Sequence, residues 1–147
     1  MRIHPSAIID HTAELAEDVE VQAFTIIEPG VQIGAGTIIG PHCVIGAGTV
    51  LGKNNRCYSG AQLGVAPQDL KHIKGSIGRT VIGDGNTFRE FVTVSSSTDY
   101  GDGDIHKVTA VGNQCLLMAC SHVGHDCRVG NRVIIANSAA LAGHVEI

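Results

Sequence analysis

The stretch "VQIGAGTIIGPHCVIGAGTVLG" (residues 31–52) repeats an aliphatic residue at every sixth position. These positions hold Ile33, Ile39, Ile45 and Leu51, and a glycine follows each of them. A helix would need a period near 3.6 and an amphipathic strand a period of two, so neither explains a sustained period of six. The pattern instead predicts a solenoid, in which each hexad forms a short strand, points its aliphatic residue inward and then turns.

The same period runs through most of the chain. The further inward positions are Ile3, Ile9, Leu15, Val21, Ile27, Cys57, Leu63, Ile82, Phe88, Val94, Val111, Leu117, Val123, Val129, Ile135, Leu141 and Ile147. If three hexads close one coil, residues 18 apart in sequence stack at the usual strand spacing of about 4.8 Å. We therefore predict an all-β fold, a parallel β-helix of hexapeptide repeats with three hexads per coil, forming one domain over residues 1–147.

Two segments break the period, at about residues 64–80 and 95–110. Long loops thrown from a regular scaffold are usually functional or disordered, and two loops beside the same stack favour function. The ladder ends on Ile147 without the polar cap that a solenoid needs. From this we expect the chain to be the C-terminally truncated, N-terminal part of a longer protein.

Composition narrows the class of protein. The chain has 147 residues and a net charge of −4, which argues against a general nucleic-acid binder. The longest apolar runs fall short of the roughly 18 residues of a membrane span, and the N-terminus "MRIHPSAIID" lacks an apolar signal core. Five cysteines without a Cys-x-x-Cys pair predict reduced thiols in a cytoplasmic protein.

The chemistry concentrates in "ACSHVGHDCRVGN" (residues 119–131), which carries His122, His125 and Asp126. Gly143 follows His125 by 18 residues, so its backbone should stack beside that histidine. An imidazole next to an exposed amide suits acyl transfer, with the ring as general base and the N–H meeting the oxyanion. Asp126 could orient the ring, but adjacent strand residues point in opposite directions, so this role depends on the corner geometry. The alternative is a solvated corner histidine.

Other residues have weaker signals. Zinc needs at least three protein ligands, and His122, His125 and His144 could converge, but their spacing leads us to expect no metal. In the first interrupted segment, "PQDLKH" (residues 67–72) offers Gln68, Asp69 and Lys71 as contacts for sugar hydroxyls and phosphate. The alternative is that these residues form an ordinary solvated loop without a binding role. Met118 follows an inward leucine, so its side chain either packs or contacts an apolar ligand.

Four stretches together, "APQDLKH", "VIGDGNTFREFVTV", "LLMACSHVGHDCRVGN" and "IIANSAALAGHV", closely resemble the UDP-N-acetylglucosamine O-acyltransferases of lipid A biosynthesis. The resemblance covers essentially the whole chain in order. It implies left-handed winding, a homotrimer with sites between subunits, no metal and no cofactor. It also implies transfer of an (R)-3-hydroxyacyl group from acyl carrier protein to the glucosamine 3-hydroxyl of UDP-N-acetylglucosamine.

The resemblance assigns a role to each candidate residue. His125 matches the general base, Asp126 its support and Gly143 the oxyanion donor. Substrate contacts match Gln68, Asp69, Lys71, His122 and His144, while Met118 matches a position near the acyl chain and Asn137 one near the pantetheine arm of the donor.

The chain departs from the family at Ser95 and Ser96, where relatives usually carry a His-Arg pair, and in the longer loop that follows. The resemblance therefore assigns no substrate contact to these two residues or to that loop. Two rival functions also stand: another hexapeptide-repeat N-acyl- or acetyltransferase, and a non-catalytic β-helix used for binding or assembly.

Overall fold

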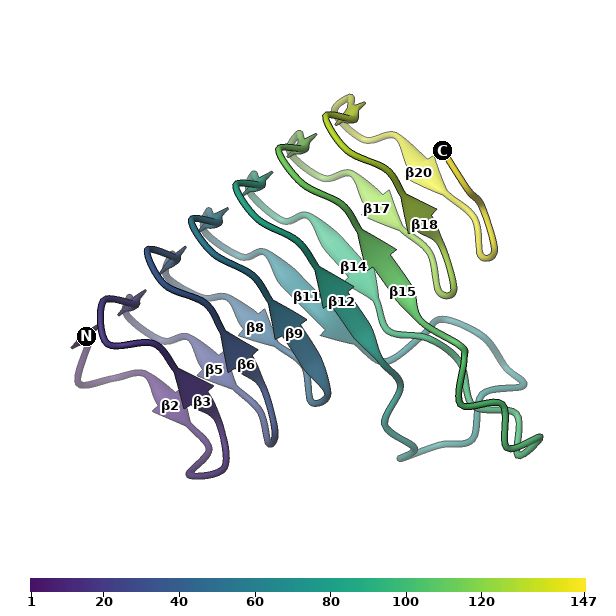
Figure 1. The fold of residues 1–147 in the computed structure, drawn as a ribbon, viewed down its shortest axis with the longest axis horizontal. Helices are drawn as coiled ribbons and strands as arrows, with labels where there is room; N and C mark the ends of the chain where they lie inside the picture. The colour runs from purple at the N-terminus through teal and green to yellow at the C-terminus, as the bar shows by residue number, and fades with distance from the viewer.

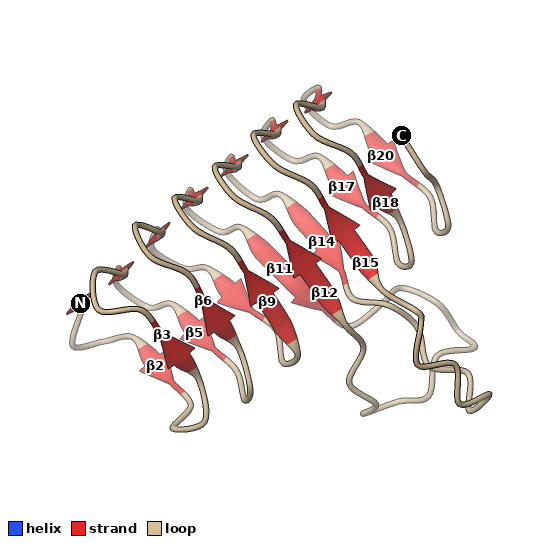
Figure 2. Cartoon of the chain, viewed as in Figure 1, coloured by secondary structure: helices blue, strands red, loops and turns tan.

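The computed structural model describes residues 1–147 as 20 short strands joined by turns and loops, without a helix (Figure 2). The strands form three parallel sheets, and the chain winds through them in turn as a left-handed β-helix. The all-β prediction and the predicted architecture are confirmed. No helix in the structure has the length and apolarity needed to cross a bilayer.

Each of the first six coils contributes one strand to each sheet, and the last contributes one to sheet A and one to sheet B. Sheet A contains β1 (Arg2–Ile3), β4 (Glu20–Val21), β7 (Ile38–Ile39), β10 (Arg56–Cys57), β13 (Thr87–Phe88), β16 (Leu116–Leu117) and β19 (Ile134–Ile135). Sheet B contains β2 (Ile8–Ile9), β5 (Ile26–Ile27), β8 (Val44–Ile45), β11 (Gln62–Val65), β14 (Thr93–Ser95), β17 (His122–Val123) and β20 (Ala140–Leu141). Sheet C contains β3 (Glu14–Leu15), β6 (Gln32–Ile33), β9 (Thr49–Leu51), β12 (Thr80–Ile82), β15 (Thr109–Val111) and β18 (Arg128–Val129).

The register follows the predicted stacking. Ile3 lies opposite Val21, and Ile9 lies opposite Ile27, so residues 18 apart are neighbours. The two loops do not disturb this order, because Phe88 still stacks between Cys57 and Leu117. The loops are therefore insertions into complete coils, and the scaffold continues unchanged on both sides of them.

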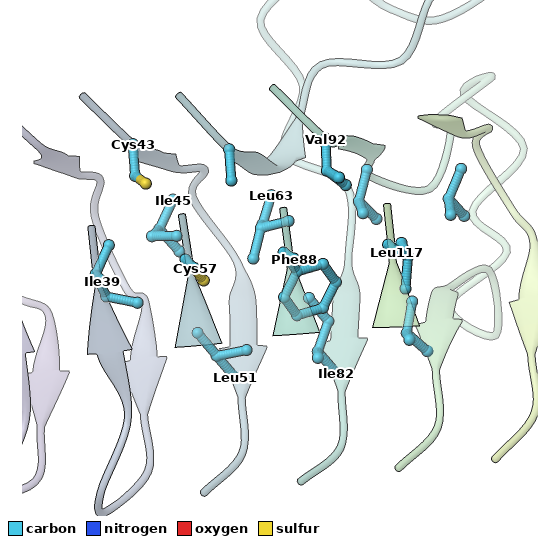
Figure 3. Close-up of a cluster of buried hydrophobic side chains, with 14 of the residues drawn as sticks. Ile39, Cys43, Ile45, Leu51, Cys57, Leu63, Ile82, Phe88, Val92 and Leu117 are labelled. Atoms are coloured by element: carbon cyan, nitrogen blue, oxygen red, sulfur yellow. The ribbon is translucent and has the colours of Figure 1, made fainter. Parts of the chain in front are cut away.

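The inward residues of all three sheets form one apolar column (Figure 3). Phe88 is the only aromatic residue in this core, and its ring is fully buried. Its sheet neighbour on one side is the small Cys57, which leaves room for the ring. Truncating a buried phenylalanine to alanine typically costs about 3–5 kcal/mol.

The five cysteines are free thiols and form no disulfide. Burial raises the pKa of the Cys43 thiol to about 11.

Glycine follows the inward residue where successive coils come too close for a side chain. A Cβ on Gly46 would lie 2.1 Å from the carbonyl oxygen of Gly64. At the corners, a residue with positive φ recurs every six positions, and ten of these residues are not glycine. Asp126 and His144 are two of the ten, with φ of 60° and 63°. The corners thus set the direction of the side chains that matter below.

The two insertions span residues 66–79, between β11 and β12, and residues 96–108, between β14 and β15. They are called here the first and second loops, and their ends lie within two residues of the predicted ones. Both join sheet B to sheet C, so they leave the stack at the same edge, called here the B–C edge (Figure 1). The loops bond to each other: the N–H of Ile73 donates to the Asp99 carbonyl, and the N–H of Asp99 donates to His72 Nδ1.

Candidate active site

His125 and Asp126 sit on the B–C edge, at the corner between β17 and β18. The left-handed φ of Asp126 turns its side chain toward the preceding residue instead of away from it. As a result, His125 Nδ1 and Asp126 Oδ2 lie 2.8 Å apart. Both side chains are largely buried, at 15% and 6% exposed. The corner therefore makes the pairing that strict strand alternation would have prevented.

The second loop fixes the Asp126 carboxylate. The Thr98 hydroxyl donates to Asp126 Oδ2 at 2.8 Å, and the Thr98 N–H donates to Oδ1 at 3.2 Å. The Asp126 N–H donates to the Thr109 hydroxyl at 2.8 Å. An ionised carboxylate can only accept, so His125 Nδ1 must carry the proton in this pair. Nε2 of the neutral ring then presents a lone pair, which is the requirement for a general base.

Gly143 packs against the His125 ring, at the equivalent corner one coil on. A Cβ at this position would lie 2.4 Å from His125 Cε1 and 2.5 Å from Nε2, so only glycine leaves room for the imidazole. The predicted stacking of these two residues is confirmed. The Gly143 N–H donates to no acceptor in the protein, whereas the N–H of nearby Gly124 donates to the Leu141 carbonyl. A free amide beside a base is what an acyl-transfer oxyanion requires.

Two further histidines surround this pair. The His144 ring meets the His125 ring edge-on, with centroids 5.1 Å apart, and it is mostly exposed. His122 points outward from β17, and its Nδ1 lies 2.7 Å from the Thr93 hydroxyl. Burial lowers the pKa of His122, and the neighbouring His125 lowers it further. His122 is therefore neutral at neutral pH and can exchange hydrogen bonds with a bound ligand.

Asp69 reaches this cluster from the first loop. Its Oδ2 lies 3.6 Å from His125 Nε2 and accepts a hydrogen bond from the Tyr100 hydroxyl at 2.6 Å. Its Oδ1 accepts the Lys71 N–H at 2.8 Å. The Tyr100 hydrogen bond, followed by the Lys71 N–H, lowers the pKa of Asp69. Of the other predicted loop residues, Gln68 and the Lys71 side chain are exposed beside Asp69.

A cavity of about 410 Å³ opens beneath the first loop. Asp69, His72 and Lys74 line it together with Ser96, so the cavity adjoins the His125 cluster through Asp69. Ser95 and Ser96, at which the sequence departs from the pattern expected of the family, are both buried. Of the two, Ser96 lines the cavity, so a small side chain stands at this part of its wall.

Met118 and Asn137 lie elsewhere. They line a small pocket of about 170 Å³ with Arg89, Glu90 and their neighbours, at the corners between sheets A and B, called here the A–B edge. The face of sheet B, which carries His122, separates this pocket from the B–C edge. Within a single chain, the predicted site residues thus form two groups: one around His125 and one around Met118.

Sequence reasoning missed Thr98 and Tyr100. The interrupted period predicts a functional second loop but assigns a role to no residue in it. Tyr100 is one of only two tyrosines in the chain, which was the one available signal. Its contact with Asp69 depends on how two irregular loops pack together, and no periodic pattern encodes that packing.

The sequence pattern raised a metal site formed by His122, His125 and His144 as an alternative. The structure instead brings ligand atoms of His125, Asp126 and His144 within 4.8 Å of one another. In this set, however, His125 Nδ1 donates to Asp126, whose oxygens also accept from Thr98. His125 and Asp126 are thus already held together by a hydrogen bond, as the acid–base pair described above.

Comparison with known proteins gives the chain relatives over its whole length. A family model described as bacterial transferase hexapeptide (six repeats) matches residues 19–53 and 109–143. The acyl-[acyl-carrier-protein]--UDP-N-acetylglucosamine O-acyltransferase of Halorhodospira halophila is 51% identical over 145 residues, covering 99% of this chain and 54% of that protein. The protein of the same name from Trichlorobacter lovleyi is 57% identical over 137 residues, covering 93% of this chain and 51% of that protein.

Solved structures with a similar fold include enzymes of the same name. The crystal structure of Francisella novicida UDP-N-acetylglucosamine acyltransferase superposes with a TM-score of 0.92 at 38% identity, covering 98% of this chain and 51% of that one. The chain thus spans about half the length of the proteins that it matches.

Proposed function

We propose that this homologue of the UDP-N-acetylglucosamine O-acyltransferases transfers an (R)-3-hydroxyacyl group from acyl carrier protein to the 3-hydroxyl of UDP-N-acetylglucosamine, the first step of lipid A biosynthesis. The observation that carries the proposal is the His125–Asp126 pair, with the His125 ring packed against Gly143, whose amide is free. Base, orienting carboxylate and oxyanion donor are the three groups that acyl transfer to a hydroxyl needs.

In the proposed reaction, His125 Nε2 takes the proton of the acceptor hydroxyl as its oxygen attacks the thioester carbonyl of the donor. The Asp126 carboxylate, 2.8 Å from Nδ1, stabilises the imidazolium that forms. The carbonyl oxygen becomes an oxyanion and receives the Gly143 N–H. When the tetrahedral intermediate collapses, the C–S bond breaks and the imidazolium protonates the departing thiolate of the carrier protein. The ring returns to its neutral state.

The first loop supports binding of the acceptor. Asp69 is ionised at neutral pH and can accept hydrogen bonds from sugar hydroxyls at the rim of the 410 Å³ cavity. Lys74 lines the same cavity and Lys71 stands exposed beside it, so a diphosphate has cations to meet. Gln68, His122 and His144 are proposed to supply further polar contacts around the sugar.

The donor side and the assembly are proposed together. Met118 would contact the acyl chain and Asn137 the pantetheine arm, but both lie on the A–B edge and not on the edge of His125. A homotrimer would bring the A–B edge of one subunit to the B–C edge of another. The apolar side chains exposed on sheet B and the A–B edge support such a contact; they are Ile8, Phe24, Ile26 and Phe91.

The proposed chemistry requires neither a metal nor a cofactor, because His125 moves the proton and Gly143 meets the charge. We also propose that the protein works in the cytoplasm, where thiols stay reduced. The five free cysteines support this location.

Mass spectrometry of products tests the proposal directly. The chain is incubated with UDP-N-acetylglucosamine and, in separate reactions, with 3-hydroxyacyl carrier proteins of several chain lengths or with acetyl-CoA. A 3-O-hydroxyacyl product formed only with carrier-protein donors is expected. Transfer from acetyl-CoA alone would assign another acyltransferase activity. No product, and no stabilisation of the fold by any substrate, would assign a binding or assembly role.

A further inference from the structure

Tyr100 of the second loop is held on both sides. Its hydroxyl donates to Asp69 Oδ2 at 2.6 Å, and the Lys107 ammonium lies 4.2 Å from the centre of its ring. Lys107 is anchored in turn by Asp102 at 2.6 Å. The loop thus clamps the phenol between a cation and a carboxylate, so its direction is fixed.

The clamp decides what Asp69 can touch. The backbone N–H of Lys71 donates to Asp69 Oδ1, and the Tyr100 hydroxyl donates to Asp69 Oδ2. Oδ2 lies 3.6 Å from His125 Nε2. That distance is too long for a hydrogen bond. Without the phenol, a small rotation would bring Oδ2 onto Nε2 and favour the imidazolium form of the ring. A protonated Nε2 could not accept the proton of an acceptor hydroxyl.

We propose that Tyr100 is a positioning residue, whose hydroxyl holds the Asp69 carboxylate off His125 so that the base keeps its lone pair and Asp69 stays available to the acceptor. This inference rests on the proposed function, since it deepens the role of the same site. Tyr100 acts through Asp69 and not on the reacting atoms.

Charged and titratable groups approach His125 from every side, so the effect of Tyr100 must be separated from theirs. Asp126 shares its corner, His122 lies on β17, His144 lies on the next coil, and Asp69 comes from the first loop. The Tyr100 hydroxyl lowers the pKa of Asp69, and Asp69 raises the pKa of Tyr100. At neutral pH the phenol is therefore a donor and the carboxylate an acceptor.

Tyr100→Phe is the informative variant, because it removes only the hydroxyl and leaves the ring against Lys107. Tyr58→Phe is the matched control. Tyr58 is the only other tyrosine, and its ring faces the guanidinium groups of Arg56 and Arg89. Both substitutions remove one phenol oxygen. A difference between their effects therefore comes from where the hydroxyl lies and not from the loss of a hydroxyl as such.

The first readout is the pH profile of kcat/KM for UDP-N-acetylglucosamine. In Tyr100→Phe the acidic limb moves to higher pH, which lowers kcat/KM at pH 6 by about tenfold, the scale of one hydrogen bond to a charged group. The loss shrinks as the pH rises, and at pH 9 the variant approaches wild type. An unchanged profile, or an equal loss at every pH, would overturn the proposal.

The second readout needs no turnover, so it separates this inference from the proposed function. Nitrogen-15 spectra of ring-labelled histidine are recorded at pH 7, with His125 assigned through its loss in His125→Gln. In wild type, Nε2 gives the signal of a lone-pair nitrogen; in Tyr100→Phe it shifts toward that of a protonated one. Tyr58→Phe leaves it unchanged. Identical spectra for wild type and Tyr100→Phe would contradict the inference, even if the chain proved inactive.

Discussion

The φ of Asp126, at 60°, shows how a single backbone angle builds the site. A non-glycine residue in the left-handed region usually costs about 1 kcal/mol or more, although aspartate tolerates it better than most. The same angle recurs at other corners, so the scaffold already bears this cost and Asp126 adds only its carboxylate. A regular corner thus directs a functional side chain without a dedicated loop.

At the residue scale, Gly143→Ala should strongly lower kcat while sparing the fold. The added methyl would lie 2.4 Å from His125 Cε1, so it must displace the ring from Asp126. Gly143 does not have a positive φ, so alanine brings no backbone strain. We expect kcat to fall at least about 100-fold, the scale of a misplaced base, with little change in the melting temperature.

Gly130→Ala is the matched control for that prediction. It lies at the next corner of the coil, between sheets C and A, and the atom nearest to an added methyl would be the Ile147 carbonyl oxygen at 3.3 Å. Near-normal kcat in this variant is expected. Near-normal kcat in Gly143→Ala would show that the ring does not need its present position.

Most of the site is predictable because stacking converts sequence distance into spatial distance. The 18-residue interval by itself places Gly143 beside His125. The direction of Asp126 was not predictable, because a period of six says where a corner falls and nothing about its φ. Tyr100 was beyond reach for a related reason: it meets Asp69 through two loops that share no period with the coils.

At the element scale, the two loops depend on each other through carboxylates. Asp69 accepts from Tyr100, and Asp99 accepts from Ser76 and from the Gly101 N–H. These hydrogen bonds lower the pKa of both aspartates. The bounds of the loops were predictable because the period stops and restarts, whereas their mutual docking was not.

This docking should weaken in acid. The folded pKa of each aspartate lies below its unfolded value of about 3.9, so the stabilisation is fully present above that pH and is lost as pH falls through the folded value. The amide of Ile73, bonded to the Asp99 carbonyl across the loops, reports the contact. Its hydrogen-exchange protection factor should drop between pH 5 and pH 2.5, while that of the strand amide of Val44 holds. Equal protection of Ile73 at both values would contradict the prediction.

At the scale of the whole molecule, the outward faces of the sheets differ. Ile26 on sheet B and Val50 on sheet C are both half exposed, at 40% and 39%. Of these two sheets, sheet B continues into further exposed apolar residues, namely Ile8 on the same sheet and Phe24 at the adjoining corner. The proposed trimer uses this face, because burying it removes the larger apolar patch from water.

The two residues allow a matched test of assembly. Ile26→Glu should convert the trimer to monomers in sedimentation or light scattering, because the carboxylate would be buried without a partner. Val50→Glu should leave the trimer intact, because Val50 lies on sheet C, outside the proposed contact. Each glutamate lies on an exposed strand, so both monomers should still fold. A monomeric wild type, or dissociation by Val50→Glu alone, would show that another face, or none, makes the assembly.

The most direct measurement of the central claim is kcat for wild type, His125→Ala and His11→Ala. His11 also stands next to an aspartate, Asp10, at an early corner of the B–C edge, but it is far from the loops and its side chain is 92% exposed. Loss of a positioned base should lower kcat about 10²- to 10⁴-fold in His125→Ala, with wild-type activity in His11→Ala. Wild-type activity in His125→Ala would mean that His125 is not the base.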